Sequence, residues 1–258
     1  MRNLFSKKKK TDGEHRTLQL ITDKNMPFGY VEAYKSLRTN LNFMSGSMDV
    51  HTLVITSTVP EESKSNVAVN MAMSLAESGK KVALVDCDLR KPVLHRYLKA
   101  GHNIKGVSNV LSNQCTLDEA LKELPEFKMS FLPAGTPPPN PSEMLSQPQM
   151  QAMVDALHEK FDLVIFDAPP ISVVTDAAVI GRYVDGALFV VRSDFAPTDA
   201  VRGAVRKLQG AGVKVLGSVL TRYDMKNALK GSSYAYSYAY NYNYAYDKSK
   251  ADTTAENV

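Results

Sequence analysis

Five short apolar runs alternate with helical stretches along this chain of 258 residues, and this rhythm constrains the fold more than any other feature. The runs are rich in β-branched residues and almost continuous, as strands are when both faces of a parallel sheet are buried. They cover 52–56, 82–85, 163–166, 187–191 and 213–220, with 129–132 as a further candidate strand. Helices are predicted between them, at about 65–79, 142–160, 175–184 and 198–211. This order predicts an α/β fold: a doubly wound, mostly parallel sheet with helices on both faces.

Three regions of different composition divide the chain. Residues 1–28 are predicted to be a basic, flexible N-terminal arm, and residues 29–230 the folded domain. Residues 231–258 carry no core-forming pattern, which predicts a disordered C-terminal tail. The folded domain should begin with an N-terminal helix, because three apolar residues share one helical face there; they are Tyr34, Leu37 and Leu41.

Charge is concentrated at the N-terminus. The first sixteen residues contain six Lys and Arg against two acidic residues, which accounts for the whole net charge of +4. The rest of the chain is therefore neutral, which argues against a broad nucleic-acid-binding face. The run Lys7–Lys10 suits a mobile arm near an acidic partner or an anionic membrane, or simply a solvated terminus.

Composition indicates a protein of the cytoplasm. Two cysteines, Cys87 and Cys115, are too few for a disulfide scaffold or a four-ligand zinc site, and both are expected to be reduced. No apolar run approaches the roughly 20 residues that a membrane helix needs. Any membrane association is therefore expected to be peripheral, at the inner face of the cell membrane, and through a partner.

A candidate phosphate loop follows the first strand, at residues 57–65. Such a loop wraps backbone N–H groups around phosphate oxygens, and it supplies a Lys for the β- and γ-phosphates and a hydroxyl for Mg²⁺. Lys64 and Ser65 suit these last two roles. The loop lacks the usual glycines, so a helix N-cap with an incidental lysine remains the alternative.

Acidic residues end two other predicted strands. Asp86 and Asp88 follow the run 82–85, and their i, i+2 spacing points both side chains the same way at the carboxyl edge of the sheet. They are suited to hold Mg²⁺ or to accept a proton from a hydroxyl. Asp167 ends a buried strand, where a carboxylate is costly unless a metal ion lies nearby.

Seven tyrosines alternate with Ala, Ser and Asn in the tail. They are Tyr234, Tyr236, Tyr238, Tyr240, Tyr242, Tyr244 and Tyr246. A phosphate-handling domain joined to a strip of phenolic hydroxyls suggests that the chain phosphorylates tyrosines on copies of itself.

With these motifs the chain resembles the bacterial tyrosine kinases of the capsule and exopolysaccharide type (BY-kinases), P-loop proteins related to ParA and MinD ATPases. The resemblance covers about residues 29–246. Its carriers are EAYKSLRTN (32–40), the loop ending Lys64-Ser65, VDCDLRKP (85–92), GVSNVL (106–111), PAGTPPPNPSEML (133–145), VIFDAPP (164–170) and the tyrosine cluster.

The resemblance implies the cofactors ATP and Mg²⁺ and a role for each site residue. Lys64 corresponds to the Walker A lysine, Ser65 to the Mg²⁺-binding hydroxyl, and Asp167 to the Walker B aspartate. Asp86 and Asp88 correspond to the Walker A′ aspartates. The residues expected to bind the nucleotide are Pro60, Glu61, Glu62, Ser63, Lys64, Ser65 and Asn66. We favour Asp86 as the acceptor of the tyrosine proton, although the sequence does not separate it from Asp88.

The resemblance also implies partners. Glu32, Lys35 and Arg38 match the family's self-association motif E-x-x-R-x-x-R, with Lys for the first Arg, which predicts a ring-like homo-oligomer. A membrane adaptor of the polysaccharide co-polymerase type is expected to activate the kinase, and a cognate tyrosine phosphatase to reverse it. No nucleic-acid partner is expected.

The chain departs from the family pattern in the phosphate loop. The usual loop reads P-G-E-G-K-S, whereas Glu61 and Ser63 replace the two glycines here. A side chain at a position of positive φ costs about 1 kcal/mol or more. Thr221 also stands where the family often has Asn near the base. Two other functions remain open: a ParA/MinD-like ATPase switch without tyrosine transfer, and a catalytically impaired scaffold.

Overall fold

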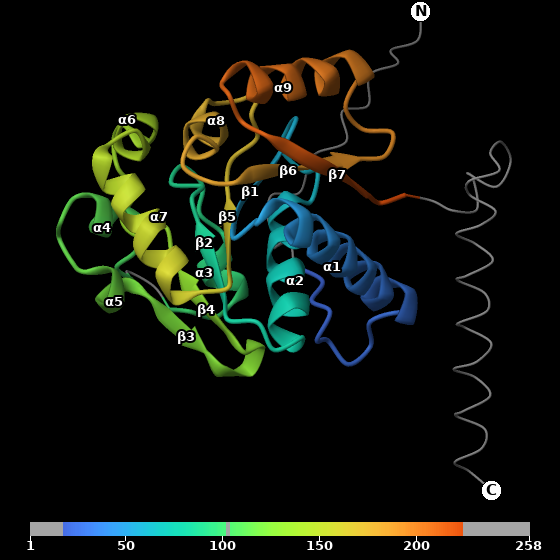
Figure 1. Ribbon diagram of the computed structural model, residues 1–258, viewed down its shortest axis with the longest axis horizontal. Coiled ribbons are helices and arrows are strands. Elements are labelled where there is room, and N and C mark those ends of the chain that lie inside the picture. The colour runs from blue at the N-terminus through green and yellow to red at the C-terminus, as the bar shows by residue number, and fades with distance from the viewer. Residues whose placement is uncertain (1–17, 102–103, 224–258) are drawn as a thin grey trace, which may run out of the picture.

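A seven-stranded sheet forms the centre of the molecule, in the order β3-β4-β2-β5-β1-β6-β7. The computed structural model describes residues 18–101 and 104–223. All neighbouring strands are parallel except the edge pair β3 and β4 (Figure 1). The strands are β1 (Thr52–Ser57), β2 (Val82–Asp86), β3 (Lys122–Leu124), β4 (Met129–Leu132), β5 (Leu163–Asp167), β6 (Gly186–Arg192) and β7 (Val215–Thr221). The predicted fold class is confirmed.

Helices cover both faces of this sheet (Figure 1). They are α1 (Phe28–Met48), α2 (Lys64–Glu77), α3 (Leu94–Tyr97), α4 (Val107–Leu111), α5 (Leu117–Ala120), α6 (Pro141–Leu145), α7 (Pro148–Lys160), α8 (Asp176–Ile180), α9 (Thr198–Gly210) and the 3-10 turn η1 (Pro125–Phe127). Successive strand residues alternate between two cores. Val54 packs with the layer of α7, α8 and α9, whereas Leu53 and Ile55 pack with α1 and α2. Burial on both faces explains why the strands read as continuous apolar runs.

The predicted helix at 142–160 is two helices in the structure. Gln147, between α6 and α7, has extended backbone angles, and Pro148 is the first residue of α7. A residue before proline is disfavoured in the helical region, and proline fits the first helical position. The chain therefore turns between the two helices instead of continuing.

Residues 18–28, which fall within the predicted flexible arm, are described by the structure and contact the folded domain. Ile21 is buried, and its backbone N–H donates to Asn70 Oδ1 at 2.8 Å. The carbonyl oxygen of Gln19 accepts hydrogen bonds from Tyr30 Oη at 3.0 Å and Asn70 Nδ2 at 2.7 Å. These bonds hold the segment from residue 18 onward against α1 and α2. The lysine run and all seven tail tyrosines lie outside the described residues.

The N-terminal helix places the three predicted apolar residues in the core. Tyr34 and Leu41 are buried, and Leu37 is half-buried against the same cluster. Cys87 and Cys115 are both unpaired. Among the described residues, no helix has the length and apolarity needed to cross a membrane.

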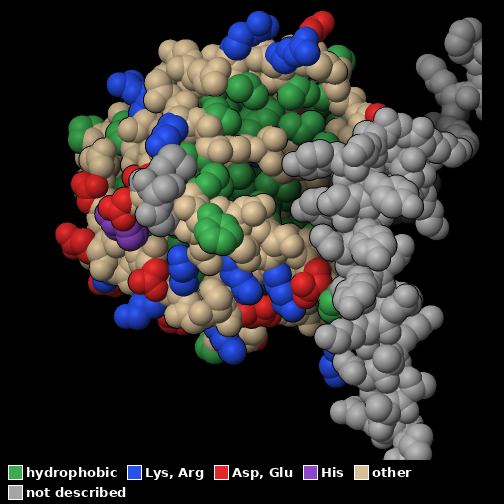
Figure 2. Space-filling model, turned by 45° about the vertical axis from the view of Figure 1, so that its right-hand side comes forward, with side chains coloured by type: hydrophobic (Ala, Val, Ile, Leu, Met, Phe, Trp, Pro, Cys, Tyr) green, Lys and Arg blue, Asp and Glu red, His purple; other side chains and the backbone are tan. Residues whose placement is uncertain are grey.

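One side of the molecule carries exposed apolar surface. In Figure 2, hydrophobic side chains gather on the face turned toward the viewer, with Lys and Arg side chains above and below them. Phe28 of α1 is 42% exposed and Leu220 of β7 is 51% exposed. Apolar patches with polar rims are typical of surfaces that contact other proteins.

Candidate active site

Three central strands bring the predicted site residues to one edge of the sheet. β2, β5 and β1 are neighbours, and Asp86 at the end of β2 is in register with Asp167 at the end of β5. β1 ends at Ser57 and leads through the phosphate loop into α2, whose first residue is Lys64. Carboxyl ends of parallel strands are where ligands bind in doubly wound folds.

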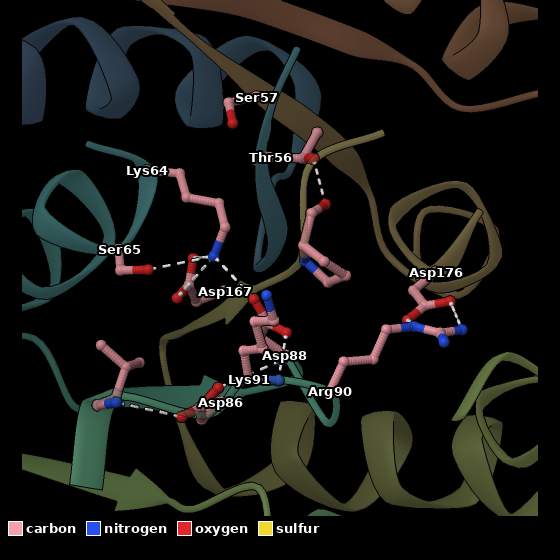
Figure 3. Close-up of polar contacts among 12 residues, drawn as sticks. Thr56, Ser57, Lys64, Ser65, Asp86, Asp88, Arg90, Lys91, Asp167 and Asp176 are labelled. Carbon is pink, nitrogen blue, oxygen red and sulfur yellow. Dashed lines mark hydrogen bonds and ion pairs between the residues drawn. The ribbon is translucent and has the colours of Figure 1, made fainter. Parts of the chain in front are cut away.

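Lys64 lies at the centre of this edge (Figure 3). Its Nζ is 3.3 Å from Asp167 Oδ1 and 3.4 Å from Asp88 Oδ2, and it also lies 3.1 Å from Ser65 Oγ. The Asp167 side chain is fully buried, and only 12% of the Lys64 side chain is exposed. The structure therefore brings together Lys64, Ser65, Asp88 and Asp167 as the sequence predicts.

Burial and mutual repulsion shift the pKa values of these groups. Burial raises the pKa of Asp86 well above its usual range, and the nearby Asp167 carboxylate raises it further. The pKa of Asp167 is also raised by burial, although Lys64 opposes the shift. Burial alone would lower the pKa of Lys64, but Asp167, Asp88 and Asp86 raise it. Three carboxylates around one ammonium group leave an excess of negative charge, which favours binding of a cation or a proton.

The two Walker A′ aspartates have different surroundings. Asp86 is fully buried, and its oxygens accept the backbone N–H groups of Asp88 at 3.2 Å and Leu94 at 3.3 Å. Asp88 directs Oδ2 toward Lys64, while its Oδ1 accepts the backbone N–H of Lys91 at 3.1 Å. In this conformation Asp88 faces the lysine, and Asp86 supports the turn behind it.

The phosphate loop adopts a left-handed backbone at the two positions where a side chain replaces glycine, and this conformation is costly for residues with a side chain. Glu61 has a φ of 76° and Ser63 a φ of 70°, so both residues that replace glycine are left-handed. Left-handed residues within a turn help direct successive N–H groups into one concavity, which can bind an anion. The loop therefore keeps the geometry of a glycine-containing loop at a cost of about 1–2 kcal/mol per residue.

Two side chains of the predicted nucleotide-binding set point elsewhere. Glu62 is buried, and its carboxylate accepts the backbone N–H of Val59 at 2.8 Å. Asn66 Oδ1 accepts hydrogen bonds from Tyr30 Oη at 2.7 Å and Tyr34 Oη at 3.2 Å, on the α1 side of α2. Both residues offer a nucleotide their backbone only. Pro60 and Glu61 are exposed at the tip of the loop.

The sequence interpretation assigned no role to an ion pair that joins three segments beside the site. Arg90 Nε donates to Asp176 Oδ2 at 2.9 Å, and Arg90 Nη2 donates to Ser142 Oγ at 2.8 Å. Asp176 is fully buried. The pair ties the turn after Asp88 to the start of α6 and to α8 (Figure 3). The only sequence signal was the Arg of the D-x-D-x-R segment.

The predicted metal residues do not form a ready-made cage. Within residues 18–101 and 104–223, no group of three His, Cys, Asp or Glu side chains is placed to hold a metal ion. Mg²⁺ usually takes one or two carboxylates together with waters and phosphate oxygens. The residues Ser65, Asp88 and Asp167 fit such a partial ligand set, and the excess negative charge here fits a divalent ion.

The predicted self-association residues lie on α1. Lys35 Nζ is 2.7 Å from Glu32 Oε1, and both side chains are exposed. Arg38 instead donates to the carbonyl oxygen of Ser74 in α2. The motif thus divides into an exposed ion pair and an arginine that is bound within the chain.

These features define a P-loop nucleotide-binding protein. The lysine begins a helix and follows left-handed loop residues, and aspartates lie at the ends of β5 and β2. Residues 62–184 match the AAA domain family. Tyrosine-protein kinase YwqD of Bacillus subtilis is 35% identical over 73% of this chain and 79% of its own length. The putative tyrosine-protein kinase CapB of Staphylococcus aureus is 34% identical over 79% and 87%.

A solved structure agrees with these relatives. The kinase domain of the Escherichia coli tyrosine kinase ETK superposes with a TM-score of 0.72 at 32% identity, covering 77% of this chain and 81% of that one. The chain therefore belongs to the bacterial tyrosine-protein kinase family, and its activity is that of a protein-tyrosine kinase. This finding supports the kinase over an ATPase switch without tyrosine transfer. The impaired scaffold is distinguished by whether the purified protein labels itself with ATP.

Proposed function

We propose that this kinase uses ATP and Mg²⁺ to phosphorylate the C-terminal tyrosine cluster, between subunits of a homo-oligomer. The observation that carries the proposal is the position of Lys64, within 3.4 Å of both Asp88 and Asp167 beside the phosphate loop. This arrangement suits a triphosphate and a divalent ion, and the chain carries its own acceptors at Tyr234–Tyr246.

Each described residue has a defined part in the proposed transfer. Backbone N–H groups of residues 61–66 and the Lys64 ammonium hold the phosphates. Asp86 accepts the phenolic proton as the tyrosine oxygen forms its bond to the γ-phosphorus. The bond from that phosphorus to the bridging oxygen breaks, and ADP leaves. When bound, Mg²⁺ would neutralise charge on the phosphate oxygens, and Ser65, Asp88 and Asp167 would hold it.

The raised pKa of Asp86 supports its role as the proton acceptor. An efficient general base has a pKa near the working pH, and an ordinary aspartate is too weak a base for a phenol. Its two oxygens each accept one backbone N–H, from Asp88 and Leu94, which leaves lone pairs for the phenolic proton.

Phosphorylation should weaken the docking of the tail. Each phosphate adds about −1.5 to −2 charges at neutral pH. The site already contains three carboxylates, from Asp86, Asp88 and Asp167. Repulsion between these groups and a phosphorylated tail gives a cycle in which the subunits assemble, phosphorylate each other and separate.

The proposed setting is the inner face of the cell membrane. A membrane adaptor of the polysaccharide co-polymerase type would recruit and activate the kinase, which would regulate capsular or exopolysaccharide synthesis and export. A cognate phosphatase would reset the tail. The exposed apolar side chains Phe28 and Leu220 offer a surface for such contacts.

The first test is phosphotyrosine detection on purified protein with ATP and Mg²⁺, with and without a fused adaptor tail. Wild type should be labelled, and Lys64→Met should lose the signal. Lys160→Met is the matched control, because that lysine forms only an exposed ion pair with Asp118. Labelling of a variant with all seven tail tyrosines changed to Phe would contradict the proposed acceptor.

A mixing experiment tests transfer between subunits. Lys64→Met protein with an intact tail is incubated with wild-type catalytic domain that ends at residue 230. If transfer runs between subunits, the inactive chain becomes phosphorylated at a rate that rises with the concentration of the active one. Transfer within one chain predicts no labelling in this mixture.

A further inference from the structure

Glu62 is a buried carboxylate inside the phosphate loop, between the left-handed residues Glu61 and Ser63. Among the described residues, no Lys or Arg side chain forms an ion pair with it. A buried carboxylate without a charged partner must be stabilised by hydrogen bonds. The hydrogen-bond donors to the Glu62 carboxylate therefore show which segments this side chain connects.

The two carboxylate oxygens of Glu62 join the loop to β6. Oε2 accepts the backbone N–H of Val59 at 2.8 Å, which closes the loop on itself. Oε1 accepts the backbone N–H of Arg192, the last residue of β6, at 3.3 Å. One side chain thus fixes the start of the loop to the carboxyl end of a core strand.

The ends of β6 and β7 hold the loop backbone as well. Thr221, the last residue of β7, donates its hydroxyl to the carbonyl oxygen of Glu62 at 3.0 Å. Arg192 Nη1 donates to the carbonyl oxygen of Glu61 at 3.3 Å. Arg192 and Thr221 are partners in the β6–β7 register, so the two strand ends act as one support.

This support matters because the loop lacks glycine where its backbone needs it. The left-handed conformations of Glu61 and Ser63 are strained, so an unsupported loop would relax toward other shapes. If only a fraction of the molecules has the binding-competent loop, the apparent affinity for the ligand is reduced by that fraction. Bonds that hold the loop before the nucleotide arrives therefore strengthen binding.

We infer that Glu62, Arg192 and Thr221 are positioning residues that hold the phosphate loop in its nucleotide-binding shape. None of them needs to touch the reacting atoms. Their effect falls on ATP affinity and not on the transfer step, since the loop is already formed once ATP is bound. The inference rests on the proposed ATP site and adds what keeps that site formed.

The test compares Thr221→Val with Thr221→Ser in the full-length kinase. Valine removes the hydroxyl that bonds to Glu62, whereas serine keeps it. A net hydrogen bond contributes about 0.5–1.5 kcal/mol, which corresponds to roughly a twofold to twelvefold change in affinity. ATP affinity by isothermal titration should fall by that factor in Thr221→Val and recover in Thr221→Ser. The KM for ATP should rise likewise, with kcat within about twofold of wild type.

Thr116→Val is the control for a general loss of stability. Its hydroxyl accepts the backbone N–H of Glu119 and caps α5, which leads into β3 at the opposite edge of the sheet from β7. This variant should lower the melting temperature and leave ATP affinity unchanged. Glu62→Gln, which turns one acceptor oxygen into a donor, should weaken ATP binding more than Thr221→Val.

Two results would overturn the inference. One is an ATP affinity of Thr221→Val within twofold of wild type, and the other is an equal loss in Thr221→Ser. If the wild-type kinase binds no ATP at all, the proposed site fails and the inference fails with it. Normal wild-type binding with an unaffected Thr221→Val rejects the positioning role alone.

Discussion

Ser63 is the residue at which sequence and backbone conformation disagree most directly. It precedes Lys64 with a φ of 70°, and its side chain makes no capping bond to α2. Glycine adopts this conformation without the steric cost that a Cβ brings, although it also makes the unfolded chain more flexible. We predict that Ser63→Gly raises the free energy of unfolding by about 0.5–1 kcal/mol and strengthens ATP binding. Urea unfolding and ATP titration check the two parts.

The control for this prediction is Lys128→Gly. Lys128 is also left-handed, with a φ of 53°, but it ends the 3-10 turn before β4, away from the phosphate loop. It should gain similar stability without any change in ATP affinity. If Ser63→Gly is less stable than wild type, then the left-handed serine is not strained.

Asp86 makes the stability of the fold depend on pH. Because its pKa is raised in the folded state, the native protein retains this proton to higher pH than the unfolded chain does. Stability attributable to this group therefore falls as pH rises above the ordinary aspartate range, by about 1.4 kcal/mol for each unit of pKa shift. Asp86→Asn lacks the titration, so its stability relative to wild type should improve as the pH rises from the ordinary aspartate range toward the raised pKa of Asp86, and should level off above it.

Urea unfolding across that pH range measures the slope. Asp118→Asn, which removes an exposed carboxylate paired with Lys160, is the matched control for the loss of a carboxylate. A pH-independent difference for Asp86→Asn would mean that Asp86 is ionised to the same extent in both states. Kinase activity should be low in Asp86→Asn at every pH.

At the scale of elements, continuous apolar runs made the five predicted long strands readable from the sequence. The runs of β1, β2 and β5 are buried on both faces by the two helical layers, whereas β7 at the edge is only partly buried. The candidate strand 129–132 is β4. β3 escaped prediction because it has three residues, Lys122–Leu124, of which only Leu124 is buried. It forms a strand because β4 offers an antiparallel edge, and such pairing depends on tertiary contact.

The site was predictable where chemistry depends on residue type and strand order. Lys64 and Asp167 meet because β1 and β5 are neighbours. The inward turn of Glu62 and the Arg90–Asp176 pair were not predictable, since each joins residues more than eighty positions apart through loop geometry. From the sequence alone, a carboxylate in a phosphate loop is expected to face the phosphates.

Because Gly106 has no side chain, the start of α4 packs directly against the backbone of the Pro-rich loop. A Cβ at this position would lie 2.1 Å from the carbonyl oxygen of Pro133 and 2.5 Å from the backbone nitrogen of Gly135. Both contacts are with backbone, so the start of α4 and the Pro-rich loop cannot separate cheaply. We predict that Gly106→Ala lowers the free energy of unfolding by about 2–4 kcal/mol, as overpacking of a rigid site does.

Gly203→Ala is the matched control for that substitution. Gly203 lies within α9, and a Cβ there meets nothing within 4 Å. Alanine should stabilise this helix by up to about 1 kcal/mol because glycine is the poorer helix former. Equal melting temperatures for the two variants would show that the Gly106 contact is not tight.

On the scale of the whole molecule, the described part of the chain ends close to the phosphate loop. Thr221 binds the loop carbonyl of Glu62, and Tyr223 is the last residue that the structure describes. Tyr234 follows eleven residues later, and a chain spans at most about 3.3–3.6 Å per residue. The distance that these eleven residues can span is compatible with transfer within one subunit and with transfer between subunits. The choice depends on whether the kinase assembles, which the surface of α1 can test.

The exposed pair Glu32 and Lys35 is the part of the self-association motif available to another subunit, since Arg38 is bound to α2. Exchanging the two charges, as Glu32→Lys with Lys35→Glu, preserves the pair within α1 but reverses the pattern that a neighbour meets. We predict that wild type elutes as a closed oligomer in size-exclusion chromatography with light scattering, and that the exchanged variant elutes as a monomer with reduced tail phosphorylation. The equivalent exchange of Asp118 and Lys160, an exposed ion pair far along the chain, should leave the oligomer intact. An exchanged Glu32–Lys35 variant of wild-type mass and activity would exclude this pair from the interface.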